Sequence, residues 1–435
     1  MQEAIRAHQH GHLDQAEPLY RKALQMQAGQ PDALHFLGVL CHQRGRSVEG
    51  IELIRAALRS IPQHADAHNN LGNILKECGR LAEAEACYRQ ALAFAPHHAE
   101  ALGNLAIVQE ALQRPREAFE TYKQLLEHAP RLARAHYLMG VFMRDHAATP
   151  DEYEQAVICF RNAISRDSRD VRALKSLGIT LYKAGRHKEA IGVYRDWLER
   201  EPTNPVARHM LAACGGGAAP DRAEDAYVCQ IFDSFADSFD EQLLNNLDYR
   251  APQVLVDALG HVLGAPRGVL EVLDAGCGTG LCGPLIRPHA RQLSGVDLSG
   301  GMVEKARARG GYDALEVAEL SAYLQAHPDS WDVVLSADTL IYFGNLLVVL
   351  AASRSALRPG GWLAFTLEVL DSDEDRTELS SSGRYQHTRC YVERVLEASG
   401  FIDVMITHES LRKEMGVPVA GWVVLARKET GSGSC

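Results

Sequence analysis

Long apolar runs, paired cysteines and an apolar N-terminal segment are all missing from this chain of 435 residues. No stretch approaches the roughly 18 uninterrupted apolar residues that a membrane-spanning helix requires, so we expect no membrane association. None of the ten cysteines belongs to a C-x-x-C pair, which argues against a disulfide framework or a metal site. The first six residues lack the apolar core of a secretory signal. These absences predict a cytoplasmic protein.

Positive charge is scarce in the second half of the chain. Residues 216–435 carry 18 Lys and Arg against 31 Asp and Glu, whereas residues 1–215 carry 27 against 25. Binding to a phosphate backbone requires basic contacts, so we predict that nucleic acid is not the substrate. The chain is also too long for one compact core, which predicts two or three domains.

The first half of the sequence is repetitive. Leu37-Gly38 and Leu71-Gly72 lie 34 residues apart, and prolines follow with the same period. Small residues recur at Ala16, Gly50, Ala84, Ala118, Ala156 and Ala190, and bulky residues four positions later at Tyr20, Ile54, Tyr88, Tyr122, Phe160 and Tyr194. Small residues let two helices approach closely, and proline ends a helix because it lacks an N–H. The pattern resembles tetratricopeptide repeats, which predicts an all-α solenoid over residues 1–214.

Such an array has two possible roles. Stacked repeats form a groove for a peptide or protein partner, and the alternative is a rigid spacer or an oligomerisation surface, for example in a homodimer. Candidate groove residues, which could equally be solvated, are Asn69, Asn70, Asn73 and Asn104. The histidines before residue 215 have no convincing ligand spacing, and we interpret them as surface residues. The glycine-rich break after Cys214 predicts a hinge over residues 215–225.

A glycine-rich turn introduces the chemistry of the second half. The apolar run 269–273 ends at Asp274 and is followed by Ala-Gly-Cys-Gly-Thr-Gly and a helical pattern. Strand, turn and helix in this order begin a doubly wound nucleotide-binding sheet. The acid before the turn would repel the pyrophosphate of a nicotinamide dinucleotide but suits a ligand with an ammonium group. The turn resembles motif I of class I S-adenosylmethionine-dependent methyltransferases. This resemblance implies that the cofactor is bound by Asp274, Gly276, Cys277, Gly278 and Gly280.

The next two strands also end in acidic residues. The second strand ends at Asp297, where a carboxylate can accept hydrogen bonds from both ribose hydroxyls. The residues that follow resemble the family's D-L-S-x-x-M pattern, with Leu298 and Met302 at the apolar positions. The third strand is followed by Glu319 and Leu320, where the family contacts the adenine amino group and ring. A solvated strand end is the alternative for Glu319.

Residues after the fourth strand are candidates for catalysis. The strand 331–335 leads to Asp338 and Tyr342. Ligands of open α/β sheets bind beyond the carboxyl ends of the strands, so both side chains are expected at the mouth of the site. Strands near residues 401–407 and 417–426 would complete a seven-stranded, Rossmann-like sheet with an antiparallel final pair, as in class I methyltransferases.

An aromatic segment precedes the first strand. Residues 227–240 resemble a helix that covers the cofactor in small-molecule methyltransferases, which implies that Phe239 contacts the cofactor and Tyr227 the substrate. Aromatic faces attract a sulfonium as they attract an ammonium. The spacing of Phe232, Phe235 and Phe239 is also that of a core-facing stripe, and both interpretations can hold together.

Residues 226–428 as a whole resemble bacterial methyltransferases fused to tetratricopeptide repeats, whose catalytic half is similar to the Williams–Beuren-region methyltransferase-like proteins. The stretch 382–387 matches that group, which implies that Arg384 and Tyr385 lie over the substrate pocket. A plain loop is the alternative. His387 or Asp338 is the candidate general base, needed where the methyl acceptor must lose a proton. Residues 429–435 are expected to be a flexible tail.

The expected reaction is methyl transfer from S-adenosylmethionine, with S-adenosylhomocysteine as the product and no metal. Such a displacement depends mainly on alignment of the nucleophile with the methyl group. The absence of a D/N-P-P-Y motif after the fourth strand favours a small-molecule acceptor with an oxygen, carbon or other nucleophile. A protein, peptide or carrier-bound substrate recruited by the repeats is the first alternative. A repeat scaffold with a non-catalytic cofactor-binding domain is the second.

Overall fold

The computed structural model describes residues 1–236, 239–241, 248–414 and 417–430. The chain forms two compact units, Met1–Ala184 and Gly185–Cys435. The division precedes the expected hinge, so the last helices of the repeat array belong to the second unit. No helix in the described ranges is long and apolar enough to cross a membrane.

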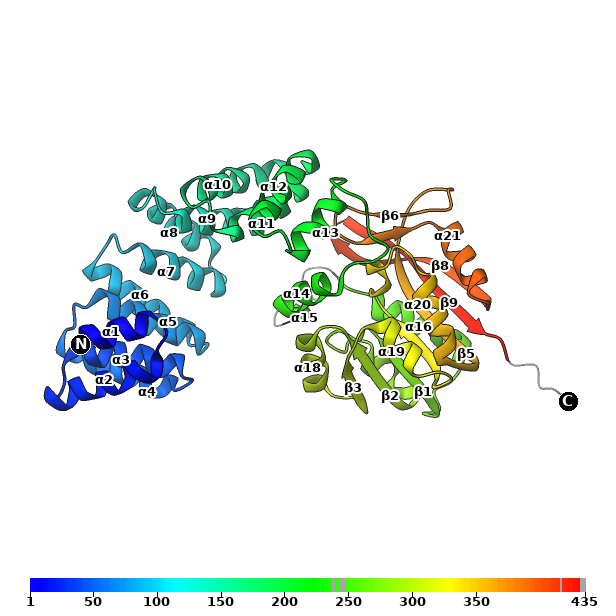
Figure 1. Cartoon of the computed structure of the whole chain (residues 1–435), viewed down its shortest axis with the longest axis horizontal. Helices are drawn as coiled ribbons and strands as arrows, with labels where there is room; N and C mark the ends of the chain where they lie inside the picture. Colours follow the sequence, from blue (N-terminus) through cyan, green and yellow to red (C-terminus); the bar gives the residue numbers. More distant parts are fainter. Residues whose placement is uncertain (237–238, 242–247, 415–416, 431–435) are drawn as a thin grey trace. The chain divides into compact units, whose positions relative to one another are not determined.

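The first unit is a series of helices that pack in consecutive pairs (Figure 1). The helices are α1 (Gln2–Gln9), α2 (Leu13–Met26), α3 (Pro31–Gln43), α4 (Ser47–Ser60), α5 (Ala65–Glu77), α6 (Leu81–Phe94), α7 (Ala99–Ala111), α8 (Pro115–His128), α9 (Ala133–His146), α10 (Tyr153–Arg166) and α11 (Val171–Lys183). One repeat is longer than the others, and its extra residues form a 3-10 turn, Pro150–Glu152, between α9 and α10. The expected helical repeat array is confirmed.

Close helix packing explains the alternation of small and bulky residues. A Cβ atom added to Gly72 would lie 2.6 Å from the ring of Tyr88, and one added to Gly140 would lie 2.8 Å from the ring of Phe160. Both rings are fully buried. The glycines therefore create the space that the aromatic side chains of the paired helices fill.

The candidate groove amides Asn69 and Asn104 are buried and bond to each other. The Nδ2 atom of Asn104 donates to Oδ1 of Asn69 at 3.0 Å and to Oδ1 of Asn73 at 2.9 Å. The hydroxyl of Tyr88 donates to the same oxygen of Asn73 at 2.8 Å. These amides link neighbouring repeats, because a buried polar group is stable only when it is hydrogen-bonded.

The expectation that the histidines lie on the surface is wrong for three of them. His35, His136 and His209 are all buried. Burial lowers the pKa of His35 to about 4, so its ring is neutral at physiological pH. Its Nε2 atom pairs with the amide of Asn70 at 2.9 Å. The repeat pattern does not mark these positions because histidine occurs in both environments.

The second unit contains the last repeat helices and an α/β domain. Its helices are α12 (His187–Arg200), α13 (Pro205–Ala213), α14 (Asp225–Phe235), α15 (Phe239–Glu241), α16 (Ala251–Leu263), α17 (Gly283–Ile286), α18 (Gly300–Arg309), α19 (Leu320–Ala326), α20 (Leu347–Ala356) and α21 (Arg389–Ala398). Its strands are β1 (Leu270–Ala275), β2 (Ala290–Asp297), β3 (Ala314–Val317), β4 (Trp331–Ser336), β5 (Leu357–Val369), β6 (Thr377–Leu379), β7 (Tyr385–His387), β8 (Phe401–Glu414) and β9 (Val417–Lys428).

The sheet has the topology expected for a class I methyltransferase. Strands β3, β2, β1, β4 and β5 are parallel neighbours, β9 is antiparallel to β5, and β8 is antiparallel to β9. The short hairpin β6–β7 extends the edge beyond β5 and is an addition to the expected seven strands. Helices cover both faces (Figure 1): α16 and α17 pack on one hydrophobic core, and α19, α20 and α21 pack on the other.

The segment expected to be a hinge is hydrogen-bonded to the α/β domain. The backbone oxygen of Asp221 accepts from the N–H groups of Gly344 and Asn345 at 2.8 and 2.7 Å, and the N–H of Ala223 donates to the oxygen of Tyr342 at 2.8 Å. Residues 221–223 therefore lie along the loop that follows β4. That loop also borders the site described next.

Candidate functional site

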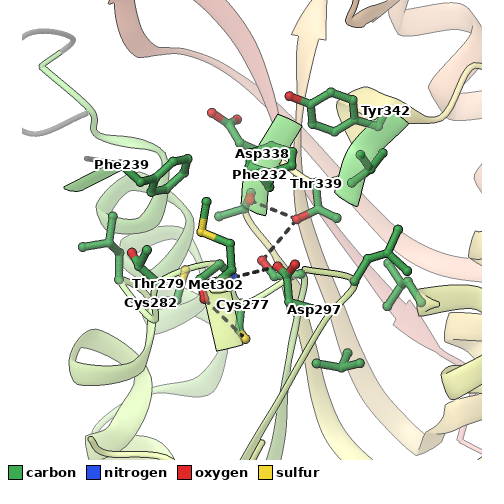
Figure 2. Close-up of a pocket in the computed structure, with 18 of the residues that line it drawn as sticks. Phe232, Phe239, Cys277, Thr279, Cys282, Asp297, Met302, Asp338, Thr339 and Tyr342 are labelled. Atoms are coloured by element: carbon green, nitrogen blue, oxygen red, sulfur yellow. Dashed lines mark hydrogen bonds between the residues drawn. The ribbon is translucent and has the colours of Figure 1, made fainter. Parts of the chain in front are cut away.

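A cavity lies beyond the carboxyl ends of β1, β2 and β4 (Figure 2). It holds about 960 Å³ of empty space, including the part that is open to solvent. Its walls come from the turn after β1, the ends of β2 and β3, the loop after β4, and α14. The sequence-predicted residues on the wall are Gly276, Cys277, Gly278, Asp297, Leu298, Met302, Glu319, Leu320, Phe239, Asp338 and Tyr342.

The turn after β1 brings the backbone to the edge of the cavity. Gly276 has a φ of +82°, and a Cβ atom there would lie 2.1 Å from the hydroxyl of Thr339. Gly278 donates its N–H to Oδ2 of Asp297 at 2.8 Å. A Cβ atom on Gly278 would meet nothing within 4 Å. The first glycine thus permits close packing, and the second borders open space.

Asp297 ends β2, and its carboxylate is held by backbone groups. Besides the bond from Gly278, the N–H of Ser299 donates to Oδ1 at 2.9 Å. Burial raises the pKa of Asp297, and these backbone hydrogen bonds oppose the rise. An ionised carboxylate has about four lone-pair sites. Asp297 can therefore accept further hydrogen bonds from the hydroxyl groups of a ligand.

Asp274 and Gly280 lie behind the turn and not on the cavity wall. The hydroxyl of Tyr312 donates to Oδ2 of Asp274 at 2.5 Å. The Oδ1 atom of Asp274 is buried without a hydrogen-bond partner in the described structure. Burial raises the pKa of Asp274 to about 7. A Cβ atom on Gly280 would lie 3.1 Å from the Tyr312 ring, so both residues pack against the same tyrosine.

Carboxylates dominate the charge of the wall. Glu319 accepts a backbone hydrogen bond in the first turn of α19 at 2.7 Å, and its other oxygen lies 3.4 Å from the guanidinium of Arg222. The lining residues that the structure describes include three carboxylates, Asp297, Glu319 and Asp338, and one guanidinium. The cavity is therefore negatively charged.

Three aromatic rings meet at the cavity (Figure 2). The ring of Phe232 lies edge-on to Phe239, with centroids 6.0 Å apart, and edge-on to Tyr342, with centroids 5.6 Å apart. Burial raises the pKa of the Tyr342 hydroxyl. Phe232 and Phe239 thus pack against each other and line the cavity, and all three phenylalanines of the segment are partly buried. That the segment covers a bound cofactor stays a prediction.

Asp338 occupies the wall in an unusual backbone conformation. Its φ is +51°, in the left-handed region that non-glycine residues rarely adopt. Its N–H donates to Oγ1 of Thr366 at 2.8 Å, and the Thr366 hydroxyl donates to Oδ1 of Asp338 at 3.0 Å. Its Oδ2 lies 2.7 Å from the guanidinium of Arg412.

Two other predicted catalytic or substrate-binding residues lie off the wall. His387 is buried, its Nε2 pairs with the oxygen of Phe343 at 2.9 Å, and burial lowers its pKa to about 4. Its neutral ring therefore donates to the loop after β4. Arg384 donates to Glu368 at 2.5 Å and to Glu414.

Tyr385 and Tyr227 also lie off the wall. The hydroxyl of Tyr385 donates to the oxygen of Pro220 at 2.5 Å. Tyr227 stacks on His209 of α13, and burial raises the pKa of its hydroxyl. Tyr385 thus attaches the segment between α13 and α14 to the α/β domain, and Tyr227 attaches α14 to α13.

Comparison with known proteins agrees with this geometry. Residues 273–365 match the family model described as a methyltransferase domain, and residues 1–65, 63–131 and 151–205 match models of tetratricopeptide repeats. The chain is 32% identical to methyltransferase-like protein 27 of Homo sapiens over 171 residues, which are 39% of this chain and 67% of that protein. The chain belongs to the S-adenosylmethionine-dependent methyltransferases.

This methyltransferase is also similar to two bacterial O-methyltransferases. It is 32% identical to the ubiquinone biosynthesis O-methyltransferase of Thiobacillus denitrificans, over 23% of this chain and 46% of that protein. It is 29% identical to the malonyl-acyl-carrier-protein O-methyltransferase of Enterobacter lignolyticus, over 39% of this chain and 57% of that protein. The chain therefore spans about half the length of these two relatives.

Several lining residues of the methyltransferase were not predicted from sequence. They include Arg222, Tyr249, Pro252 and Thr339. Residues before β1 reach the cavity through tertiary packing, which no local motif marks. Arg412, the partner of Asp338, was also missed: the register of β8 shifts between Ser410 and Arg412, so strict alternation along the strand does not identify it as an inward residue.

Proposed function

We propose that the cavity binds S-adenosylmethionine and that the domain transfers its methyl group to a small-molecule acceptor. The observation that carries this proposal is the combination of a negatively charged wall, aromatic rings and a glycine turn at the carboxyl ends of the strands. When bound, S-adenosylmethionine supplies an electrophilic methyl group on a sulfonium. Carboxylates and aromatic faces both suit such a cation.

The cofactor's nucleoside would lie between β2 and β3. Asp297 would accept hydrogen bonds from the ribose hydroxyls, and Glu319 and Leu320 would contact the adenine. The glycine backbone at 276–280 would hold the amino-acid end, with Asp274 behind it. Phe239 and Met302 would cover the cofactor. A nicotinamide dinucleotide fits less well, because its pyrophosphate would face carboxylates with only Arg222 to balance them among the described lining residues.

We assign to Asp338 the role of contacting the methyl acceptor. It lies on the wall with Tyr342 (Figure 2), where it can accept the proton that a hydroxyl or amine releases during attack. We assign His387 a positioning role, because its buried ring pairs with the backbone oxygen of Phe343 in the loop after β4 and lies off the cavity wall.

A carrier-bound or protein substrate is the second candidate. It is favoured by the repeat array and by the similarity to an enzyme whose name specifies an acyl-carrier protein. In this case the repeats would bind the carrier or protein and deliver the reacting group to the cavity.

Calorimetry tests the first half of the proposal. S-adenosylmethionine and S-adenosylhomocysteine should bind the full chain, and NAD should not. Asp297→Ala should weaken both by about tenfold or more, because each lost hydrogen bond to a charged group costs about 1.5–3 kcal/mol. The exposed Asp373→Ala is the matched control. Preferential binding of NAD would overturn the proposal.

Transfer of labelled methyl groups to cell extract tests the second half. We expect the label in the small-molecule fraction, and the same label when residues 1–184 are removed. The second candidate would be favoured if the full chain labels protein and the chain without residues 1–184 does not. Cofactor binding without any label transfer would identify a non-catalytic scaffold.

A further inference from the structure

Asp338 is held by buried ionic groups on β5 and β8. Its partner Arg412 is only 4% exposed and comes from β8. The other donors of this guanidinium contact Glu368 of β5 and Glu414 of β8, the latter at 2.9 Å. Because Glu368 and Glu414 fix the guanidinium of Arg412, this guanidinium holds the Asp338 carboxylate in one orientation.

The charges in this network leave no cation available for an anionic substrate. Arg384 contacts the same two glutamates as Arg412. The three carboxylates of Asp338, Glu368 and Glu414 thus pair with two guanidiniums, which leaves a net charge of about −1 at neutral pH. Both arginines lie off the cavity wall, whereas Asp338 lies on it.

The surroundings of Asp338 in the cavity are aromatic. Tyr249 and Tyr342 line the same cavity, and the charge of Asp338 contributes to the raised pKa of each, after burial. The Thr366 hydroxyl and Arg412 use two lone-pair sites of the carboxylate, out of about four. The remaining sites can accept an O–H or N–H from a molecule that lies among these rings.

We propose that Arg412 is a positioning residue that fixes Asp338 to accept a hydrogen bond from the reacting O–H or N–H, and that the methyl acceptor is a flat, apolar molecule that is neutral or cationic at this end. The inference rests on the proposed function and names its substrate class. The acceptor's oxygen or nitrogen forms a bond to the methyl carbon as the sulfur–carbon bond breaks. Asp338 takes the proton that the acceptor releases and passes it to water.

Three phenyl probes of similar size test the substrate class. Benzylamine, benzyl alcohol and benzoate are titrated into the full chain saturated with S-adenosylhomocysteine, and binding is followed by saturation-transfer NMR. We expect benzylamine and benzyl alcohol to bind more tightly than benzoate. Asp338→Asn should weaken benzylamine by about tenfold, because a charge-assisted hydrogen bond is lost. Benzoate that binds as tightly as benzylamine to the wild type would overturn the inference.

Two substitutions test the role of Arg412. Arg412→Gln should lower the initial rate of label transfer to the small-molecule fraction on the order of 10²-fold, as misplacement of a catalytic group does. Arg412→Lys, which keeps the charge, should restore part of this rate. Affinity for S-adenosylhomocysteine should stay within about twofold in both variants, because Arg412 lies away from the proposed cofactor end. The exposed Arg291→Gln is the control.

The outcomes separate this inference from the proposed function. If S-adenosylhomocysteine does not bind the wild type, the proposed function fails. If S-adenosylhomocysteine binds, two results contradict the positioning role alone. The first is that Arg412→Lys transfers label no faster than Arg412→Gln. The second is that the affinities for S-adenosylhomocysteine and for the phenyl probes fall together with the melting temperature. If Arg412→Gln does not fold, Arg412→Lys alone tests the positioning role: its rate of label transfer should fall while its affinity for S-adenosylhomocysteine stays unchanged.

Discussion

The imidazole of His209 stacks on the ring of Tyr227, with centroids 3.9 Å apart and planes inclined by 26°. The Nε2 atom of the same imidazole pairs with the oxygen of Gly383 at 2.9 Å. His209 lies on α13, the last helix of the repeat array, whereas both of its partners belong to the α/β domain. The next helix, α14, carries Phe232 to the cavity wall. The end of the repeat array is therefore also a structural part of the methyltransferase.

Two truncations should differ in stability for this reason. A chain that begins at residue 185 keeps α13, whereas a chain that begins at residue 215 loses His209 and exposes Tyr227. We expect the shorter chain to lose about 1.5–3 kcal/mol, the value of burying one large side chain. Thermal unfolding and binding of S-adenosylhomocysteine measure the difference. Equal melting temperatures would show that α13 contributes nothing to the domain.

Gly276 should be intolerant of any side chain. Gly276→Ala places a Cβ atom 2.1 Å from Thr339 at a φ of +82°, so we expect a loss of about 1–3 kcal/mol from backbone strain alone, and weaker cofactor binding. Gly260 of α16 is the matched control, because a Cβ atom there meets nothing within 4 Å. Gly260→Ala should stabilise the protein by about 0.5–1 kcal/mol. Chemical denaturation measures both changes.

Asp274 should make stability depend on pH. Burial raises its pKa in the folded state from 3.8 to about 7, so the folded protein binds the proton more tightly than the unfolded chain does. This contribution to the free energy of unfolding is fully present below pH 4 and is lost as pH rises toward and through 7. Asp274→Asn removes it. Denaturant unfolding from pH 5 to pH 8 should therefore show the wild type losing stability relative to this variant. Parallel curves would contradict the assignment.

Asn104 should stabilise the repeat array from within. It donates to two asparagines of the preceding repeat, and Asn104→Ala leaves their buried oxygens with fewer partners. We expect a loss of about 1–3 kcal/mol in the free energy of unfolding. Gln90→Ala, at an exposed position of α6, should change it by less than about 0.5 kcal/mol. An equal effect of the two substitutions would indicate that the amide network contributes little.

The parts of the fold that follow local rules were predictable from sequence. The 34-residue period of Gly38 and Gly72 reflects helix pairs that repeat the same contact. Asp297 and Asp338 were expected at the cavity because ligands of open α/β sheets bind beyond the carboxyl ends of the strands, and both line it. The strands of the hairpin β6–β7 have three residues each, too few to show an alternating pattern.

Tertiary packing decided the features that sequence did not reveal. The glycine-rich stretch after Cys214 indicated a hinge, yet hydrogen bonds hold residues 221–223 against the loop after β4. The burial of His35 and His209 depends on the helices packed against them, which periodicity alone does not specify. Arg412 escaped notice because a shift in register interrupts β8.

The side chains that bond to Asp338 lie outside the residues that match the methyltransferase family model. That match ends at residue 365, whereas Thr366 and Arg412 come after it. Mutations in the last strands could therefore alter which molecule is methylated while the residues proposed to hold the nucleoside stay unchanged. Under this proposal, substitutions in the C-terminal segment separate the choice of methyl acceptor from cofactor binding.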